Sequence, residues 1–358
     1  MHLLQDPALT KVGLVAKGPV VAGARLFRSL AFAALAAGLA SAPAEAGGTA
    51  STPVKIVHAF NDLFGRHDGY RAIHAKGLVC EGTFEASSEA RAVTRAVHMQ
   101  GTELPVVVRF SDFAGIPSVA SGSAIASPRG MSIKFILPSG FDTDIVAHSY
   151  DGFPAATPAD FLGFLQAVHA SGADAPAPTA LDRFAASHPA ARRFLDAPKP
   201  TPASYATEAF FGVNAFTFEN AAGNSVYGRY RIVPVAGTHY LDAEQASRRA
   251  PDFLWSELAE RLQREPVRFR LMLQIADPGD PVADGTALWP EDRRQVELGT
   301  LTIRRIADDN EATERRLLFT PLNLLDGIGT SDDPMLPART RAYAKSFSMR
   351  APKEALPN

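Results

Sequence analysis

The chain has 358 residues, of which 46% are hydrophobic, and its formal net charge at pH 7 is −2. This length supports one large core or at most two domains, and the balanced charge argues against a basic nucleic-acid-binding face. The single cysteine, Cys80, excludes an internal disulfide, a Cys-x-x-Cys zinc site and a Cys-x-x-Cys-His haem attachment. Cys80 lies in an alternating apolar run, so we expect a buried, inert thiol rather than a metal ligand.

The N-terminal region has the pattern of an export signal. An apolar run from Leu30 to Ala40 is followed by Ala44-Glu45-Ala46, a small-x-small cleavage site. This order is typical of a secretory signal peptide, predicted here for residues 1–46, with an amphipathic surface helix as the alternative. The run is too short to span a membrane, so we expect residues 47–358 to be periplasmic or secreted and not membrane-bound. The basic residues before the run are Lys11, Lys17, Arg25 and Arg28.

The first half of the remaining chain alternates like a β-sheet with a few helices. The strand Leu104–Ser111 is the clearest case, because Val106, Val108 and Phe110 face one way. Arg109 and Ser111 face the other way, which suggests that this face meets either water or a polar group. The predicted elements are a helix and turn at Pro53–Tyr70, a surface helix at 87–100, and strands at Leu78–Phe84, Leu104–Ser111, Arg129–Leu137 and Thr143–His148.

The second half continues the same pattern. Thr157 is a candidate cap for a helix at Pro158–His169, and Ser171–Ser204 is interpreted as a long crossover with one short helix around Leu181–Leu195. Strands that mostly follow one another, with few helices, predict an α+β fold: a single-domain, closed antiparallel β-barrel with surrounding helices. The further elements are strands at Tyr205–Phe218, Ser225–Val235, Pro266–Ile275 and Val296–Ile306 and a helix at Pro251–Gln263.

Near the C-terminus, Arg339 and Tyr343 are four residues apart. Pro337 suits the first turn of a helix, and a helix places Arg339 and Tyr343 on one face, with Arg350 on the same side. One interpretation is a surface arginine that packs on an aromatic ring. The other is a tyrosine phenolate, which needs a nearby positive charge because a free tyrosine has a pKa near ~10.

The motif order around this pair closely resembles the proximal segment of haem catalases. The distal segment of that family resembles Arg71-x-x-His74-Ala-Lys-Gly77, and Val108–Ser111 and Pro128–Gly130 resemble the strands that follow it. The resemblance covers roughly residues 56–350 and implies the catalase barrel with haem b as cofactor. The proximal matches are Phe319, Pro321, Asn323, Gly327-Ile328-Gly329, Met335-Leu336, Arg339 and Tyr343.

The resemblance also implies a role for each site residue. Tyr343 would be the axial iron ligand, and Arg339 would keep it ionised. His74 would be the distal base, with its ring fixed by Ser111. Three arginines would pair with the haem propionates, namely Arg71, Arg109 and Arg350. His148 stands where catalases carry an asparagine that helps to hold the peroxide, and we expect it either to replace that asparagine or to reshape peroxide access.

The expected activity follows from the same resemblance. Only eight residues follow Arg350, so the chain resembles a minimal barrel of the kind found in small catalase-related haem peroxidases. We expect a haem peroxidase that uses hydrogen peroxide or an organic hydroperoxide to oxidise a small organic electron donor, with weak or no catalase activity. The alternatives are a true catalase, a hydroperoxide-rearranging haem enzyme, a periplasmic haem-binding protein without activity, and a β-barrel for an apolar ligand. A monomer or homodimer is expected.

Overall fold

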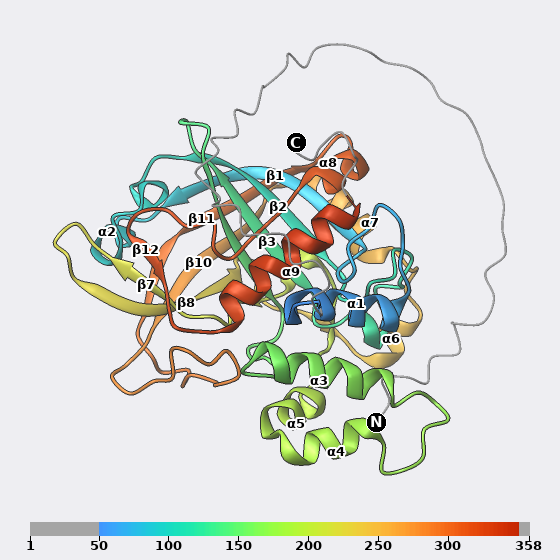
Figure 1. Cartoon of the computed structure of the whole chain (residues 1–358). Helices are drawn as coiled ribbons and strands as arrows, with labels where there is room; N and C mark the ends of the chain where they lie inside the picture. Colours follow the sequence, from blue (N-terminus) through green and yellow to red (C-terminus); the bar gives the residue numbers. More distant parts are fainter. Residues whose placement is uncertain (1–49, 351–358) are drawn as a thin grey trace. The chain divides into compact units, whose positions relative to one another are not determined.

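Most strands of the described chain form one sheet that closes into a barrel (Figure 1), and two short strands pair with each other in a second sheet. The computed structural model describes residues 50–350, and the predicted signal peptide lies outside them. In order around the ring, the barrel strands are β10 (Val267–Ile275), β11 (Gln295–Ile306), β1 (Gly77–Ala86), β2 (Leu104–Ser111), β3 (Gly130–Ile136), β4 (Asp142–His148), β6 (Phe210–Phe211) and β8 (Ser225–Pro234). All pairings are antiparallel, and β8 pairs with β10 to complete the ring. The predicted α+β barrel with surrounding helices is confirmed.

Aromatic side chains fill the barrel interior. Phe110 of β2 lies with its ring centroid 5.9 Å from that of Phe210 and 6.1 Å from that of Phe269, and all three side chains are fully buried. Cys80 is also fully buried in this core, as expected. Because strand side chains alternate between faces, a packed interior leaves the outward faces of β2, β3 and β4 to contact the helices.

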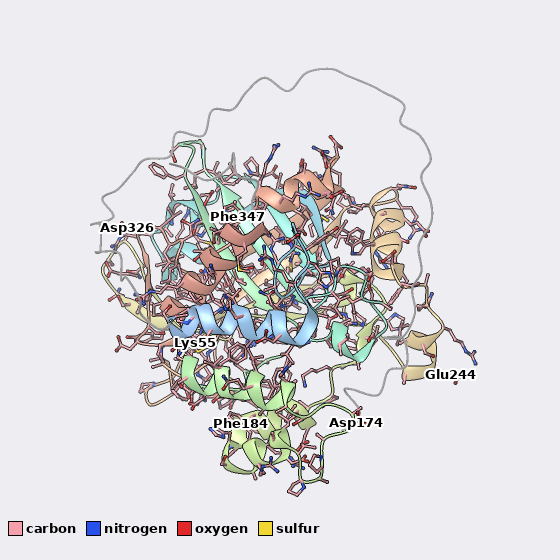
Figure 2. The ribbon with its side chains drawn as sticks, turned by 45° about the vertical axis from the view of Figure 1, so that its right-hand side comes forward. Lys55, Asp174, Phe184, Glu244, Asp326 and Phe347 are labelled. Atoms are coloured by element: carbon pink, nitrogen blue, oxygen red, sulfur yellow. The ribbon has the colours of Figure 1, made fainter. Side chains whose placement is uncertain are left out.

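Helices cover those outward faces in layers. Helix α1 (Thr52–Phe64) packs against both α9 (Met335–Arg350) and α3 (Pro158–His169), with α4 (Ala180–Ser187) and α5 (Pro189–Asp196) beyond α3 (Figure 1). In Figure 2, Phe184 marks this outer layer and Lys55 marks α1. Between residues 50 and 350, no helix is long and apolar enough to cross a bilayer. The remaining elements are α2 (Ala90–Val93), α6 (Ala243–Ser247), α7 (Phe253–Leu262), α8 (Asn310–Arg316), β5 (Thr201–Pro202), β7 (Phe216–Glu219), β9 (Tyr240–Leu241) and β12 (Ile328–Thr330).

Several predicted elements differ from the structure. The single helix predicted around Leu181–Leu195 is two helices, because Pro189 begins a new one. The strand predicted at Tyr205–Phe218 is wrong: a 3-10 turn and two short strands, β6 and β7, occupy that stretch. The helix predicted at 87–100 is limited to α2 and a 3-10 turn, and the segment is only partly at the surface, since Val97 is 58% exposed whereas Met99 is fully buried.

The start of α9 places Pro337 in the first turn of the helix, as the sequence predicts. The helix begins at Met335, two residues before Pro337, because the Asp333 carboxylate accepts a hydrogen bond of 2.8 Å from the Met335 N–H. A carboxylate at this position satisfies a backbone donor of the first turn and interacts favourably with the helix dipole. The Asp333 cap therefore sets the start of the helix, and Pro337 follows as its third residue.

We predict that Phe269→Ala lowers the free energy of unfolding by about 3–5 kcal/mol, because it leaves a cavity where a fully buried ring packs in the barrel core. Phe141→Ala is the matched control, since that ring is 59% exposed and the same truncation should change stability little. Urea unfolding of both variants measures the difference. Equal losses would show that the barrel interior does not carry the stability.

Candidate functional site

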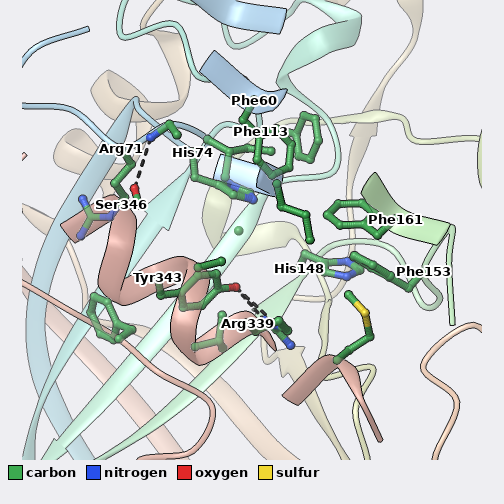
Figure 3. A pocket seen from close by; sticks show the side chains of 18 of the residues that line it. Phe60, Arg71, His74, Phe113, His148, Phe153, Phe161, Arg339, Tyr343 and Ser346 are labelled. Carbon is green, nitrogen blue, oxygen red and sulfur yellow. Dashed lines mark hydrogen bonds between the residues drawn. The ribbon is translucent and has the colours of Figure 1, made fainter. Parts of the chain in front are cut away.

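A cavity of about 220 Å³ lies between the outward faces of β2–β4 and helices α1, α3 and α9 (Figure 3). It brings together every site residue predicted from the sequence: Arg71, His74, Arg109, Ser111, His148, Arg339, Tyr343 and Arg350. Much of the remaining lining is aromatic and comes from Phe60, Phe113, Phe153, Phe161, Phe164 and Phe194. The polar groups thus converge in an otherwise apolar space, which is typical of a ligand-binding site.

On the α9 side of the cavity, Arg339 holds the phenol oxygen of Tyr343. The Nε and Nη2 atoms of Arg339 donate to Tyr343 Oη at 3.2 and 3.0 Å (Figure 3). The spacing of four residues produces this contact, as the sequence predicts. A guanidinium only donates, so both bonds favour an oxygen that carries negative charge or binds a cation. The oxygen donor itself suits a ferric ion.

Two further residues, which the sequence did not indicate, fix Arg339. Its Nη1 donates to Asn214 Oδ1, and the Asn214 amide donates to Asp333 Oδ2 at 2.7 Å. Asp333 also caps α9, so the start of the helix, the carboxylate, the amide, the guanidinium and the phenol form one chain of hydrogen bonds. Asp333 is recognisable in the sequence as a possible helix cap, but no sequence signal pointed to Asn214, which lies 125 residues from Arg339.

Opposite this helix, His74 is held in an unusual backbone conformation. Its φ of +55° lies in the left-handed region, which residues other than glycine seldom adopt. Its backbone N–H donates to Phe113 O at 2.7 Å, and its carbonyl accepts from Arg109 Nη2 at 2.7 Å. These two bonds and the edge-on Phe113 ring, 5.5 Å away, offset the strain.

The His74 ring contacts Ser111 through Nδ1, at 3.1 Å from the hydroxyl oxygen. When Nδ1 donates to this oxygen, Nε2 is left unprotonated for the cavity. Gly130 allows the arrangement, because a Cβ atom there would lie 2.6 Å from Ser111 Oγ and 3.0 Å from His74 Nδ1. Ser111 therefore occupies the position expected of a residue that fixes the tautomer.

Both cavity histidines are neutral at physiological pH. Burial, followed by the positive charge of Arg109, lowers the pKa of His74 to about 3. Burial and then Arg339 lower the pKa of His148 to about 3. The His148 ring, which stands where the family carries an asparagine, therefore stays uncharged near neutral pH.

His148 presents a hydrogen-bond donor with no protein partner. The Tyr150 N–H donates to His148 Nδ1 at 3.4 Å, so the proton of the neutral ring resides on Nε2. Within residues 50–350, this buried Nε2 has no hydrogen-bond partner. A buried donor without a partner is costly unless a ligand satisfies it, so His148 is suited to donate to a polar ligand atom in the cavity.

The three predicted anchor arginines converge at another edge of the cavity. Arg71 and Arg109 both contact the Glu314 carboxylate, with Arg109 Nε 2.6 Å from Oε1. Arg71 and Arg350 also donate to the carbonyl of Leu317, at 2.9 and 2.6 Å. The sequence did not indicate Glu314. Arg350 Nε is buried and has no partner in the described part of the chain, so the cluster can accept further carboxylates such as haem propionates.

Comparisons with known proteins agree with this geometry. A family model described as Catalase matches residues 67–355. The chain is 36% identical over 302 residues to a catalase-related peroxidase of Mycolicibacterium paratuberculosis, covering 84% of this chain and 95% of that protein. A catalase-related peroxidase of Synechococcus elongatus is 32% identical over 332 residues, covering 91% and 97%. A fungal catalase structure has the same fold, with a TM-score of 0.72 at 21% identity, over 81% of this chain and 61% of that one.

We predict that His148→Asn weakens the pH dependence of stability. A histidine with a lowered pKa in the folded protein stabilises it above the unfolded value near 6.5, and this stability is lost as pH falls toward the folded value of about 3. Between pH 7.5 and 5, wild type should lose about 2 kcal/mol more unfolding free energy than the variant. Urea unfolding at the two pH values measures this. His169→Asn, at an exposed position of α3, should behave as wild type, and identical slopes for His148→Asn would contradict the assignment.

Proposed function

Because this chain belongs to the catalase family, we propose that it is a haem peroxidase in which hydrogen peroxide or an organic hydroperoxide oxidises small organic donors. Peroxide-acting oxidoreductases are the relatives that cover nearly its whole length. The observation that carries the proposal is the pairing, in one cavity, of the Arg339–Tyr343 phenol with a neutral His74.

The residues present fit a haem. Tyr343 Oη would hold the iron, and Arg71, Arg109 and Arg350 would pair with the propionates. Cys80 is buried in the barrel core, where burial raises the pKa of its thiol, so a non-covalent haem b is the form proposed. When bound, haem supplies the iron that reacts with peroxide and the oxidising equivalents that pass to the donor.

His74 moves the proton in this proposal. Its unprotonated Nε2 accepts the proton from the peroxide hydroxyl, and the resulting imidazolium returns it to the departing oxygen, which leaves as water or an alcohol. Burial and the nearby arginines disfavour the charged ring, so the proton is held only briefly. Ser111 accepts from Nδ1 and keeps Nε2 directed at the cavity. Two electrons and two protons from the donor complete the reduction of the O–O bond.

An organic donor suits the character of the cavity. Phenylalanine side chains from α1, α3 and the neighbouring loops line the space beside His74 and His148 (Figure 3). Such a lining favours an apolar or aromatic molecule over a small, strongly hydrated one. The two relatives that this chain covers over 95% and 97% of their own length are named catalase-related peroxidases, which supports peroxidase over catalase activity.

We further propose that the protein acts in the periplasm or outside the cell, as a monomer or homodimer. The location rests on the signal-peptide pattern in residues 1–46. The proposed state of assembly rests on the small barrel expected from the sequence. Light scattering of the purified protein and fractionation of expressing cells address the two points separately.

The test is stopped-flow absorbance of the purified protein mixed with hydrogen peroxide, with and without a phenolic donor. We expect a haem band that changes with peroxide and recovers only when donor is added. His74→Asn keeps a residue that tolerates the left-handed backbone, and it should retain the band but react with peroxide about 10²–10⁴-fold more slowly. His98→Asn removes a buried histidine outside the cavity and should leave the rate unchanged.

Each other outcome contradicts a specific part of the proposal. Absence of a haem band would remove the cofactor and the function together. Oxygen release without donor, at a rate that matches peroxide loss, would make the protein a catalase. An unchanged peroxide rate in His74→Asn would leave the cofactor in place but remove His74 from proton transfer.

A further inference from the structure

Behind two of the cavity arginines lies a largely buried carboxylate that the proposed chemistry does not use. Glu314 lies on α8 with a side chain that is 12% exposed, and it contacts both Arg71 and Arg109. Burial raises the pKa of Glu314, but Arg109 and Arg71 lower it by more, so the carboxyl stays ionised at neutral pH. A permanent negative charge therefore sits among the arginines expected to bind propionates.

Glu314 is held in this position by its surroundings. Asn310, at the start of α8, accepts from Val79 N–H at 2.7 Å and donates to Gly77 O at 3.2 Å, which ties the helix to β1. Gly77 also leaves the space in which Arg109 meets Glu314, because a Cβ atom there would overlap both side chains. The contact is therefore built into the backbone and is not a chance encounter of surface side chains.

The charges in this cluster do not balance. Arg71, Arg109 and Arg350 bring three positive charges, and Glu314 brings one negative charge, which leaves a surplus of two. Arg350 forms no ion pair with a described residue, and its buried Nε is unpartnered. Burial, followed by repulsion from Arg71 and Arg109, lowers the pKa of Arg350 to about 8, so it is still a cation at pH 7. Two further carboxylates would neutralise the cluster.

We propose that Glu314 is a positioning residue that sets this surplus at two charges, so that the cluster matches the two free carboxylates of a porphyrin and its preference for that diacid is limited. The inference rests on the proposed haem function and adds a determinant of cofactor selection. Without Glu314 the surplus would be three, and the attraction for a dianion would rise. Glu314 thus limits how tightly the arginines hold the cofactor and keeps the cluster neutral when both carboxylates are bound.

The test compares binding of two fluorescent probes, zinc protoporphyrin IX and its dimethyl ester, to wild type and variants freed of haem. The measured quantity is the affinity for the diacid divided by the affinity for the dimethyl ester. This ratio cancels effects on folding and on contacts with the porphyrin ring. In wild type the diacid should bind more tightly. Glu314→Gln should raise the ratio by about tenfold, since a unit negative charge close to the carboxylates is removed. Glu314→Asp keeps the charge and should retain the wild-type ratio.

A charge-compensating pair makes the test sharper. Arg350→Met lowers the surplus to one and should reduce the diacid preference. Adding Glu314→Gln to that variant restores a surplus of two through Arg71 and Arg109, and the preference should return toward wild type. Glu311→Gln is the matched control on the same helix, because Glu311 pairs with Arg315 at the surface and should leave the ratio unchanged.

The outcomes separate this inference from the proposed function. If neither porphyrin binds to wild type, both fail. If both porphyrins bind but Glu314→Gln lowers the ratio or leaves it unchanged, the charge-setting role is overturned while the haem proposal stands. If the double variant selects the diacid less than Arg350→Met does, Glu314 only supports the local structure.

Discussion

The rest of the site depends on the hydrogen bonds from Arg339 to the phenol oxygen of Tyr343. The two side chains are four residues apart, so their contact requires the turn of α9 between them to be helical. The loop that leads into the helix is clamped to β4, where the buried Asp144 accepts from Thr320 N–H at 2.9 Å. Thr320 in turn contacts Thr340, which lies between the two site residues on α9. The barrel wall thus sets the position of the phenol through a short, continuous path.

On the opposite wall of the cavity, the adjacent residues Ser111 and Asp112 at the end of β2 face opposite sides. Ser111 faces the cavity, whereas Asp112 points into a buried network with Lys76 and Arg129, at 3.8 and 3.7 Å. Lys76 lies two residues after His74, and Arg129 directly precedes Gly130. Burying these charges is unfavourable unless each is paired, and removing one partner would leave another uncompensated. The network therefore holds together the segments that carry His74 and Ser111, through side chains that do not line the cavity.

The sequence predicted the elements whose signals lie within a few residues, and it missed those that depend on contacts between distant parts of the chain. The helix Pro158–His169 and the strand Leu104–Ser111 were predicted with their observed limits, because a threonine cap and strict alternation are encoded within a few residues. The stretch Tyr205–Phe218 was not, since its two short strands are defined by pairing with β8 rather than by their own pattern. The motif resemblance identified the residues that line the cavity, but Asn214 and Glu314 have partners more than a hundred residues away and belong to no local pattern.

In the cavity, the permanent positive charge and the proposed proton transfer belong to different kinds of side chain. Its cations come from arginines, which are held by Glu314, Leu317 O and Asn214 at the margins. Its histidines, His74 and His148, are neutral because burial removes their charge, and the same arginine cations reinforce that effect. Arg71 and Arg109, two of the arginines proposed to anchor carboxylates, thus also help to keep the His74 ring neutral. Glu314 contacts these same two arginines, so the carboxylate proposed to limit cofactor binding lies against the cations that lower the pKa of His74.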